Sequence, residues 1–194
     1  MSKLAAMLIA VIVTASAAMP ARAGESGPPL NKPLPAFELP SPRDAAQRRY
    51  LDLGQGRKTF SIGELRTGVV IIEVFNFYCP FCRREATRVN ALYNLIQSDP
   101  QLDRDIKVIG IGAGNSVVEV NDFRKTFDVA FPLFPDNNFK IHKLLGKVRT
   151  PFFIAVRIVP GGRPVVFYTR LGGFSSPRGF LEQIVEKGGL AERR

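Results

Sequence analysis

The chain has 194 residues, which is enough for one well-packed domain and too few for two ordinary ones. Its formal net charge is +10, but the basic residues are scattered and form no nucleic-acid-binding motif, so nucleic acid is not an expected partner. A solvated basic surface is the ordinary interpretation, and steering toward acidic proteins or anionic lipid is the alternative. With two cysteines and one histidine, a cysteine- and histidine-rich zinc site is excluded, and no metal or cofactor is expected.

Residues 1–23 have the pattern of a cleavable secretory signal. Lys3 supplies a positive start, Leu4 to Met19 form an apolar stretch, and Ala21-Arg22-Ala23 is a small-x-small cleavage site. A retained anchor is the alternative, but this stretch is shorter than the ~20 apolar residues that usually span a membrane. Because no later segment is apolar enough, no stable membrane span is expected after cleavage. The sequence therefore predicts a periplasmic protein.

Residues 24–34 contain several prolines and glycines and are expected to be an extended lead-in to one domain over residues 35–194. Tyr50–Leu53 and Lys58–Ile62 flank Gly54-Gln55-Gly56, a pattern that predicts a small β-hairpin. Val69–Phe77 is almost entirely apolar and β-prone, which predicts a central strand buried on both faces.

Helices and strands are expected to alternate through the rest of the chain. The sequence predicts a helix over Arg83–Ser98, a strand over Ile106–Ile111, a helix over Val117–Phe127 capped by Asn115 or Ser116, a strand over Phe131–Phe134, a helix over Phe139–Leu145, a hairpin of Phe152–Val159 and Pro164–Tyr168, and a helix from Ser176-Pro177 to about Lys187. This order predicts an α/β fold with a mixed sheet and helices on both faces.

Both cysteines lie in Cys79-Pro80-Phe81-Cys82, between the apolar strand and the first amphipathic helix. At a helix N-terminus, free backbone N–H groups and the helix dipole favour the thiolate of Cys79, with a pKa one to several units below ~8.5. Cys82, one turn later, is expected to be more buried and to act as the resolving thiol. A purely structural disulfide is the alternative, but a cross-link around two residues adds little stability. Redox chemistry is therefore the favoured interpretation.

Three groups of segments resemble the thioredoxin superfamily, over most of residues 35–188. Residues 72–82 are similar to the strand and active-site turn of the DsbA-type disulfide oxidases. Thr150-Pro151-Phe152-Phe153 resembles the turn that carries the cis-proline of this fold. Residues 35–39, 60–65 and 131–136 resemble the TlpA/ResA-type periplasmic oxidoreductases, which carry an extra strand and helix. The resemblance implies a thioredoxin-like fold with a TlpA-type insertion and a DsbA-like active-site turn.

The resemblance also implies a function. The expected protein is an extracytoplasmic thiol–disulfide oxidoreductase that exchanges a redox-active Cys79–Cys82 disulfide with cysteine-containing proteins. The TlpA-like body, and the absence of a histidine between the cysteines, favour reduction of substrates. The DsbA-like approach to Cys79 favours oxidation, so the preference for a reductase is slight. A thiol electron donor or acceptor in the membrane is a candidate partner.

Two glutamates are candidates for acid–base work. Glu73 stands within the apolar strand, six residues before Cys79, where the resembled families place a buried acid that exchanges a proton with Cys82. The alternative is a strand-edge glutamate that reaches water. Glu85 follows Cys82 by three residues, where ResA-type proteins carry a glutamate implicated in thiol acid–base properties. A solvated glutamate near Arg88 is the equal alternative.

Four further residues are expected to contact substrate. Pro151, if cis, would leave the Thr150 backbone free to pair with an extended substrate, as the resemblance implies. Tyr78 and Phe81 would form an apolar rim for a cysteine-containing peptide, with ordinary packing as the alternative. His142 is expected to be a surface or packing histidine rather than a metal ligand.

Two other functions remain open. A peroxiredoxin-like peroxidase shares this fold, but such proteins carry Pro and Thr where Asn76, Phe77 and Tyr78 stand. A non-enzymatic Sco-like copper-delivery module would use C-x-x-x-C with a downstream histidine, and neither that spacing nor a suitable placement of His142 is present.

Overall fold

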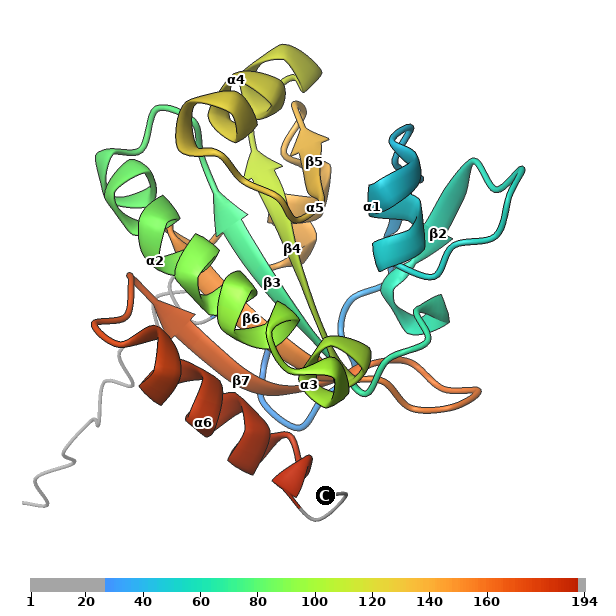
Figure 1. Cartoon of the computed structure of the whole chain (residues 1–194). Coiled ribbons are helices and arrows are strands. Elements are labelled where there is room, and N and C mark those ends of the chain that lie inside the picture. The colour runs from blue at the N-terminus through green and yellow to red at the C-terminus, as the bar shows by residue number, and fades with distance from the viewer. Residues whose placement is uncertain (1–26, 192–194) are drawn as a thin grey trace, which may run out of the picture.

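The computed structural model describes residues 27–191 (Figure 1). The expected secretory signal, residues 1–23, and the first residues of the lead-in lie outside the described residues. Between residues 27 and 191, no helix is both long enough and apolar enough to cross a membrane.

A five-stranded mixed sheet forms the centre of the molecule, in the order β5-β4-β3-β6-β7. Its parallel strands are β3 (Val69–Phe75), β4 (Ile106–Ala113) and β5 (Leu133–Asp136). Strand β6 (Phe152–Arg157) runs antiparallel to β3, and β7 (Val165–Leu171) runs antiparallel to β6. All residues of β3 are buried, which confirms the predicted central strand.

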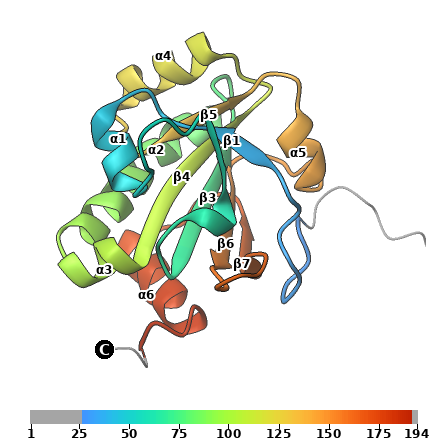
Figure 2. The same ribbon diagram turned by 90° about the vertical axis from the view of Figure 1, so that its right-hand side faces the viewer.

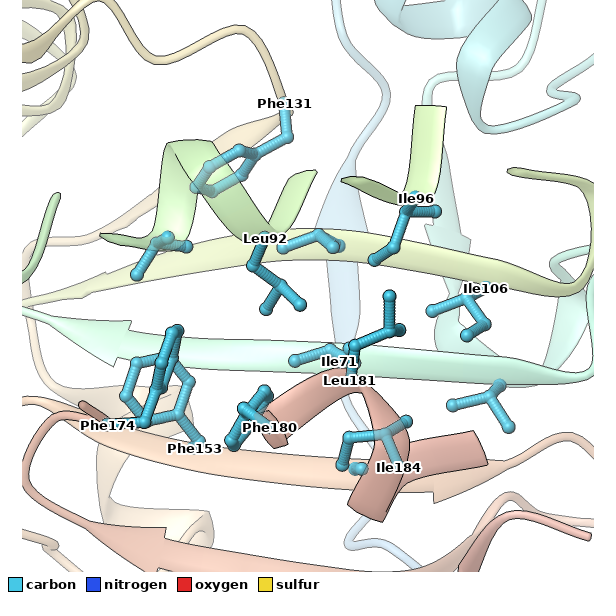
Figure 3. Packing of buried hydrophobic residues seen from close by; sticks show 14 of the residues in the cluster. Ile71, Leu92, Ile96, Ile106, Phe131, Phe153, Phe174, Phe180, Leu181 and Ile184 are labelled. Carbon is cyan, nitrogen blue, oxygen red and sulfur yellow. The ribbon is translucent and has the colours of Figure 1, made fainter. Parts of the chain in front are cut away.

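Four helices cover one face of the sheet: α2 (Pro80–Gln97), α3 (Pro100–Asp105), α4 (Val117–Phe127) and α6 (Pro177–Lys187). In Figure 1, α2 and α6 lie across this face side by side. Figure 3 shows Leu92 of α2 and Ile184 of α6 on opposite sides of Ile71 of β3, within one core cluster. The apolar stripe of each helix is therefore buried against the sheet.

The opposite face is covered by smaller elements (Figure 2). A two-stranded sheet of β1 (Glu38–Pro40) and β2 (Thr59–Ser61) lies there with η1 (Ile62–Glu64), α1 (Ala45–Tyr50) and α5 (Lys140–Leu144). Side chains that alternate with those on the α2 face, such as Val70, Ile72 and Val74, form the second core with these elements. The predicted mixed sheet with helices on both faces is confirmed.

The predicted hairpin of Tyr50–Leu53 and Lys58–Ile62 is wrong. Tyr50 ends helix α1, which begins after Asp44, whose carboxylate accepts the Gln47 N–H at 2.8 Å. The later strand pairs instead with β1, with Phe60 opposite Leu39. The sequence reasoning also missed α3, although Asp99 and Pro100 form an ordinary start signal for a helix. In both places a helix with an N-cap residue forms, although the spacing of the apolar residues there does not follow the helical period.

Helix α4 and strand β5 lie between β4 and α5 in the chain, where the TlpA-type insertion was expected. Strand β5 extends the sheet beyond β4, with Leu133 opposite Gly110. Ser116 rather than Asn115 caps α4, and it forms a capping box with Glu119. The insertion therefore places the start of α4 next to the turn that follows β3.

Candidate active site

The turn between β3 and α2 is held by two asparagine side chains. Asn76 donates to the Ala113 carbonyl at 2.8 Å and accepts the Tyr78 N–H at 2.9 Å. The buried Asn115 accepts the Phe77 N–H at 2.8 Å. The sequence reasoning gave neither residue this role, although asparagine directly after a buried strand is a usual turn former. These contacts fix the turn against the end of β4.

The two cysteines occupy the first turn of α2. Cys79 is the N-cap residue, and its sulfur accepts the Cys82 N–H at 3.4 Å. Pro80 is the first helical residue, where a missing N–H costs nothing. Cys79 is partly exposed, whereas Cys82 is fully buried, and both are free thiols. This is the predicted pairing of an accessible thiol with a buried one.

The surroundings shift the two thiol pKa values in opposite directions. Desolvation alone would raise the pKa of Cys79. Hydrogen bonds from the Thr150 hydroxyl, the Cys82 thiol and the backbone of Cys82 and Phe81 lower it by more. The pKa of Cys79 therefore lies below its ordinary value. Desolvation raises the pKa of Cys82 strongly, and its hydrogen bond to Cys79 and the nearby Glu73 charge raise it further. Cys79 is therefore the thiolate-forming sulfur.

Glu73 faces α2 from the centre of the sheet. It alternates with Ile72 and Val74, so its side chain lies on the same face as Cys82. It is 1 % exposed, and its Oε1 has no hydrogen-bond partner among residues 27–191. Desolvation, with the charges of Glu85 and Cys79, raises the pKa of Glu73 to about 8. The alternative of a strand-edge glutamate in water is wrong, because β3 is the central strand.

Glu85 is also buried, so the alternative of a fully solvated surface glutamate is wrong. Its Oε1 accepts the Phe174 N–H at 2.9 Å, and its Oε2 pairs with Arg88 at 3.2 Å. The carboxylate therefore connects α2 to the segment before α6. Gly173 leaves room for it, since a Cβ at that position would lie 2.1 Å from Glu85 Oε2.

The loop before β6 faces the dithiol. Its Thr150–Pro151 peptide bond is cis, as expected. When protonated, the Cys79 thiol donates to the Thr150 carbonyl at 3.3 Å. The Pro151 carbonyl accepts the Gly172 N–H at 2.9 Å, which joins this loop to the end of β7. The loop that carries Thr150 and Pro151 therefore lies against the Cys79 sulfur.

Tyr78 and Phe81 are both strongly exposed, at 66 % and 65 %. Burial in the core is thus excluded for either ring, and both stand beside Cys79 as a rim. The interaction of the Tyr78 hydroxyl with Glu119 of α4 raises the pKa of Tyr78. Helix α4 therefore helps to hold one side of the rim.

A groove of about 460 Å³ opens beside the dithiol. Three parts of the chain line it: the outer face of the first turns of α2, the cis-proline loop, and the segment after β7. Its apolar lining comes from Phe81, Pro151 and Leu171. Arg84, Arg88 and Arg149 supply positive charge to the groove. The sequence alone did not predict that these three residues lie close together.

His142 has a structural place in α5. Its Nε2 lies 2.8 Å from the Val148 carbonyl oxygen, and its ring contacts Phe139 edge-on. Within the described part of the chain, no group of three or more His, Cys, Asp or Glu side chains could hold a metal ion.

A strand, a turn and a helix that carry C-x-x-C, facing a cis-proline loop on a mixed sheet, define a thioredoxin-fold protein with a dithiol site. The chain belongs to the AhpC/TSA family, whose profile matches residues 30–168. A search of curated proteins found no significant match.

Several solved structures have the same fold. The thioredoxin domain of a thiol-disulfide oxidoreductase from Bacteroides vulgatus is 14 % identical, with 81 % of this chain and 98 % of that chain covered and a TM-score of 0.58. StoA from Bacillus subtilis is 17 % identical, with 78 % and 98 % covered and a TM-score of 0.54. A secreted Mycobacterium tuberculosis disulfide oxidoreductase homologous to E. coli DsbE is 14 % identical, with 79 % and 95 % covered and a TM-score of 0.52. These similarities establish the thioredoxin-like fold.

Proposed function

We propose that the protein is a thiol–disulfide oxidoreductase that exchanges its Cys79–Cys82 pair with cysteine-containing proteins outside the cytoplasm. The observation that carries this proposal is the contrast between the two sulfurs: a partly exposed thiol with a lowered pKa beside a buried thiol with a raised one. The signal-like pattern of residues 1–23 supports the location. So does the similarity to the secreted Mycobacterium tuberculosis disulfide oxidoreductase.

In the reductive direction, the Cys79 thiolate attacks one sulfur of a substrate disulfide. A Cys79–substrate disulfide forms, and the other substrate sulfur leaves as a thiolate that takes a proton from water. Cys82 then loses its proton and attacks the Cys79 sulfur, which releases the second substrate thiol. Two electrons pass to the substrate, and the protein keeps a Cys79–Cys82 disulfide. In the oxidative direction the same steps run in reverse.

Glu73 is the proposed proton acceptor for Cys82. It lies on the same face of the sheet as the buried thiol, and its charge is close enough to raise the pKa of Cys82. With a pKa of about 8, its carboxyl can both release and take a proton near neutral pH. Glu85 is a positioning residue in this proposal, because it holds the Phe174 backbone and pairs with Arg88 at the edge of the site.

Reduction of substrates is the favoured direction. The dipeptide Pro80-Phe81 places no polar side chain between the cysteines, so it offers the Cys79 thiolate no extra stabilisation of the kind that makes a dithiol strongly oxidising. Redox titration tests the direction, and a reduction potential near the reducing end of the range from ~−270 to −120 mV is the expected result. The proposed partner is a thiol electron donor or acceptor in the membrane. It returns the Cys79–Cys82 pair to the oxidation state from which the next exchange begins.

Insulin reduction tests the function. The wild-type protein is expected to accelerate precipitation of the insulin B chain with dithiothreitol as donor, and Cys79→Ala is expected to abolish the acceleration. Cys82→Ala is expected to trap a mixed disulfide with insulin, visible by mass spectrometry, because the resolving step is lost. Equal activity of all three proteins would exclude exchange at this pair.

The same preparations test the two alternatives. A peroxidase would consume peroxide rapidly in the reduced form, faster than it reduces insulin. A copper-delivery module would bind Cu(I) tightly in a competition assay. We expect neither result, since Asn76, Phe77 and Tyr78 stand where a peroxiredoxin carries Pro and Thr, and His142 Nε2 is within hydrogen-bond distance of the Val148 carbonyl oxygen.

A further inference from the structure

The groove beside the dithiol is rich in positive charge. Arg84 and Arg88 reach it from α2, and Arg149 reaches it from the loop before Pro151; all three are exposed. Glu85 is the acidic residue of this lining. The groove also lies on the side of Cys79 that the cis-proline loop faces, so a segment bound there passes close to the reacting sulfur.

Glu85 offsets one of the three arginine charges, that of Arg88, so the lining of the groove keeps a net positive charge. Its side chain is 6 % exposed, its Oε2 pairs with Arg88, and its Oε1 already accepts the Phe174 N–H. Both carboxylate oxygens are therefore occupied within the protein. A substrate segment that enters the groove therefore meets positive charge from the arginines and an apolar lining beneath it.

Arg84 is placed by its neighbour. Its guanidinium carbon lies over the Phe81 ring, 4.6 Å from the ring centre. Phe81 therefore holds the positive charge of Arg84 at the rim of the groove. Such stacking uses the planar face of the guanidinium, while its N–H donors point outward along the edge. An edge of this kind matches a carboxylate with two parallel hydrogen bonds.

We propose that this groove selects substrate segments that carry an aspartate or glutamate within a few residues of the reactive cysteine. The inference rests on the proposed exchange function and adds a substrate class to it. The substrate carboxylate pairs with the arginines of the groove while its cysteine reacts at Cys79, and apolar neighbours pack on Pro151 and Leu171. An arginine rim of this kind acts mainly on the rate of association.

Disulfide-linked peptide dimers provide the probe. Each peptide holds one cysteine and either Glu or Gln, placed two residues before or two residues after the cysteine. The reduced protein converts each dimer to two peptide thiols and becomes oxidised, so electrons balance without another reagent. Second-order rates are measured at pH 7 and divided by the rates for dithiothreitol with the same dimers, which removes intrinsic differences between the peptides.

For the wild-type protein, the Glu peptide at one of the two positions is expected to react about threefold faster than its Gln counterpart, or more. The preference is expected to shrink when salt rises from 0.02 to 0.3 M, because screening shortens the reach of exposed charges. Arg84→Gln and Arg149→Gln are each expected to lower the Glu/Gln ratio toward one.

Arg83→Gln is the matched control. Arg83 neighbours Arg84 in the sequence and is equally exposed, but its guanidinium lies over the Phe127 ring, away from the groove lining. It is expected to keep the wild-type ratio. Equal rates for all peptides, or an Arg83→Gln ratio as low as that of Arg84→Gln, would overturn the inference while leaving exchange intact. No exchange with any peptide would overturn the proposed function itself.

Discussion

The two sulfurs of the site are adjacent in space, yet the atoms around them make them chemically different. Cys79 stands at the helix start, where hydrogen bonds outweigh the cost of its partial burial. Cys82 is one turn further on, inside the core cluster below α2. A nucleophile and a resolving thiol are thus separated by a single helical turn, with the buried Glu73 on the same face of the sheet.

Thr150→Val tests the contact that lowers the pKa of Cys79. Valine keeps the branched shape but removes the hydroxyl that donates to the thiolate. The pKa of Cys79 is expected to rise, so alkylation by iodoacetamide at pH 7 slows and its pH midpoint moves upward. Thr87→Val, the same substitution at an exposed position of α2, is the control and is expected to keep the wild-type midpoint. An unchanged midpoint in Thr150→Val would contradict the assignment.

At the scale of single residues, the sequence predicted an accessible Cys79 beside a more buried Cys82, and the resemblance to the thioredoxin superfamily implied a buried Glu73 and a cis Pro151. It left the environment of Glu85 open, and it could not bring Arg84, Arg88 and Arg149 to one groove. Those arginines come from α2 and from a loop distant in sequence, and only the packing of that loop against the helix places them together.

Among the elements, short helices were the least predictable. Helix α1 has no buried residue, so it shows no apolar stripe for a pattern to detect. In contrast, β3, α4 and α6 combine apolar periods with clear boundaries, such as the Ser116 capping box and the Ser176-Pro177 start. These longer elements, with a clear apolar face and a clear start, were found from the sequence alone, whereas the six-residue helices α1 and α3 were missed.

Helix α5 depends on a residue from another element. Asp136, the last residue of β5, is buried and accepts the Ile141 N–H at 3.1 Å and the His142 N–H at 2.8 Å. Asp136→Ala leaves both donors unpaired and is expected to lower the free energy of unfolding by about 2–3 kcal/mol. Loss of hydrogen-exchange protection in residues 140–145 should accompany it.

Asp44→Ala is the comparison for that prediction. Asp44 caps α1 through one exposed hydrogen bond to Gln47, so its loss is expected to cost only about 1 kcal/mol. Urea unfolding of both variants gives the two values. A smaller effect for Asp136→Ala than for Asp44→Ala would show that α5 does not depend on its buried cap.

For the whole molecule, Glu73 makes stability depend on pH. The pKa of Glu73 rises from 4.5 in an ordinary environment to about 8 in the fold, so the folded state holds this proton where the unfolded chain has released it. Stability linked to this group is complete below pH 4.5 and falls as pH rises toward 8. Glu73→Gln removes the titration, since glutamine stays neutral.

The expected outcome is a difference between Glu73→Gln and wild type that grows with pH. It should be near zero at pH 4 and reach about 4 kcal/mol in favour of the variant at pH 8, as measured by urea unfolding, because each unit of this pKa shift corresponds to ~1.4 kcal/mol. Glu182→Gln, at an exposed position of α6, should show no such trend. A constant difference across this pH range would mean that Glu73 is ionised in the folded protein. Activity of Glu73→Gln should fall at the same time, because Cys82 loses its proton acceptor.

The sequence by itself determined the central strand, the dithiol at the start of a helix and the mixed α/β sheet, whereas the cis-proline turn was expected only from the resemblance to the thioredoxin superfamily. The first three features depend on local causes: a run of β-prone apolar residues, a helix start, and the spacing of apolar residues along the chain. Only the tertiary structure decided that β1 pairs with β2, that Glu85 is buried against the Phe174 backbone, and that three arginines share a groove with Pro151. Those relations join residues far apart in the chain, and their energies come from packing and desolvation that exist only after the sheet and its helices have assembled.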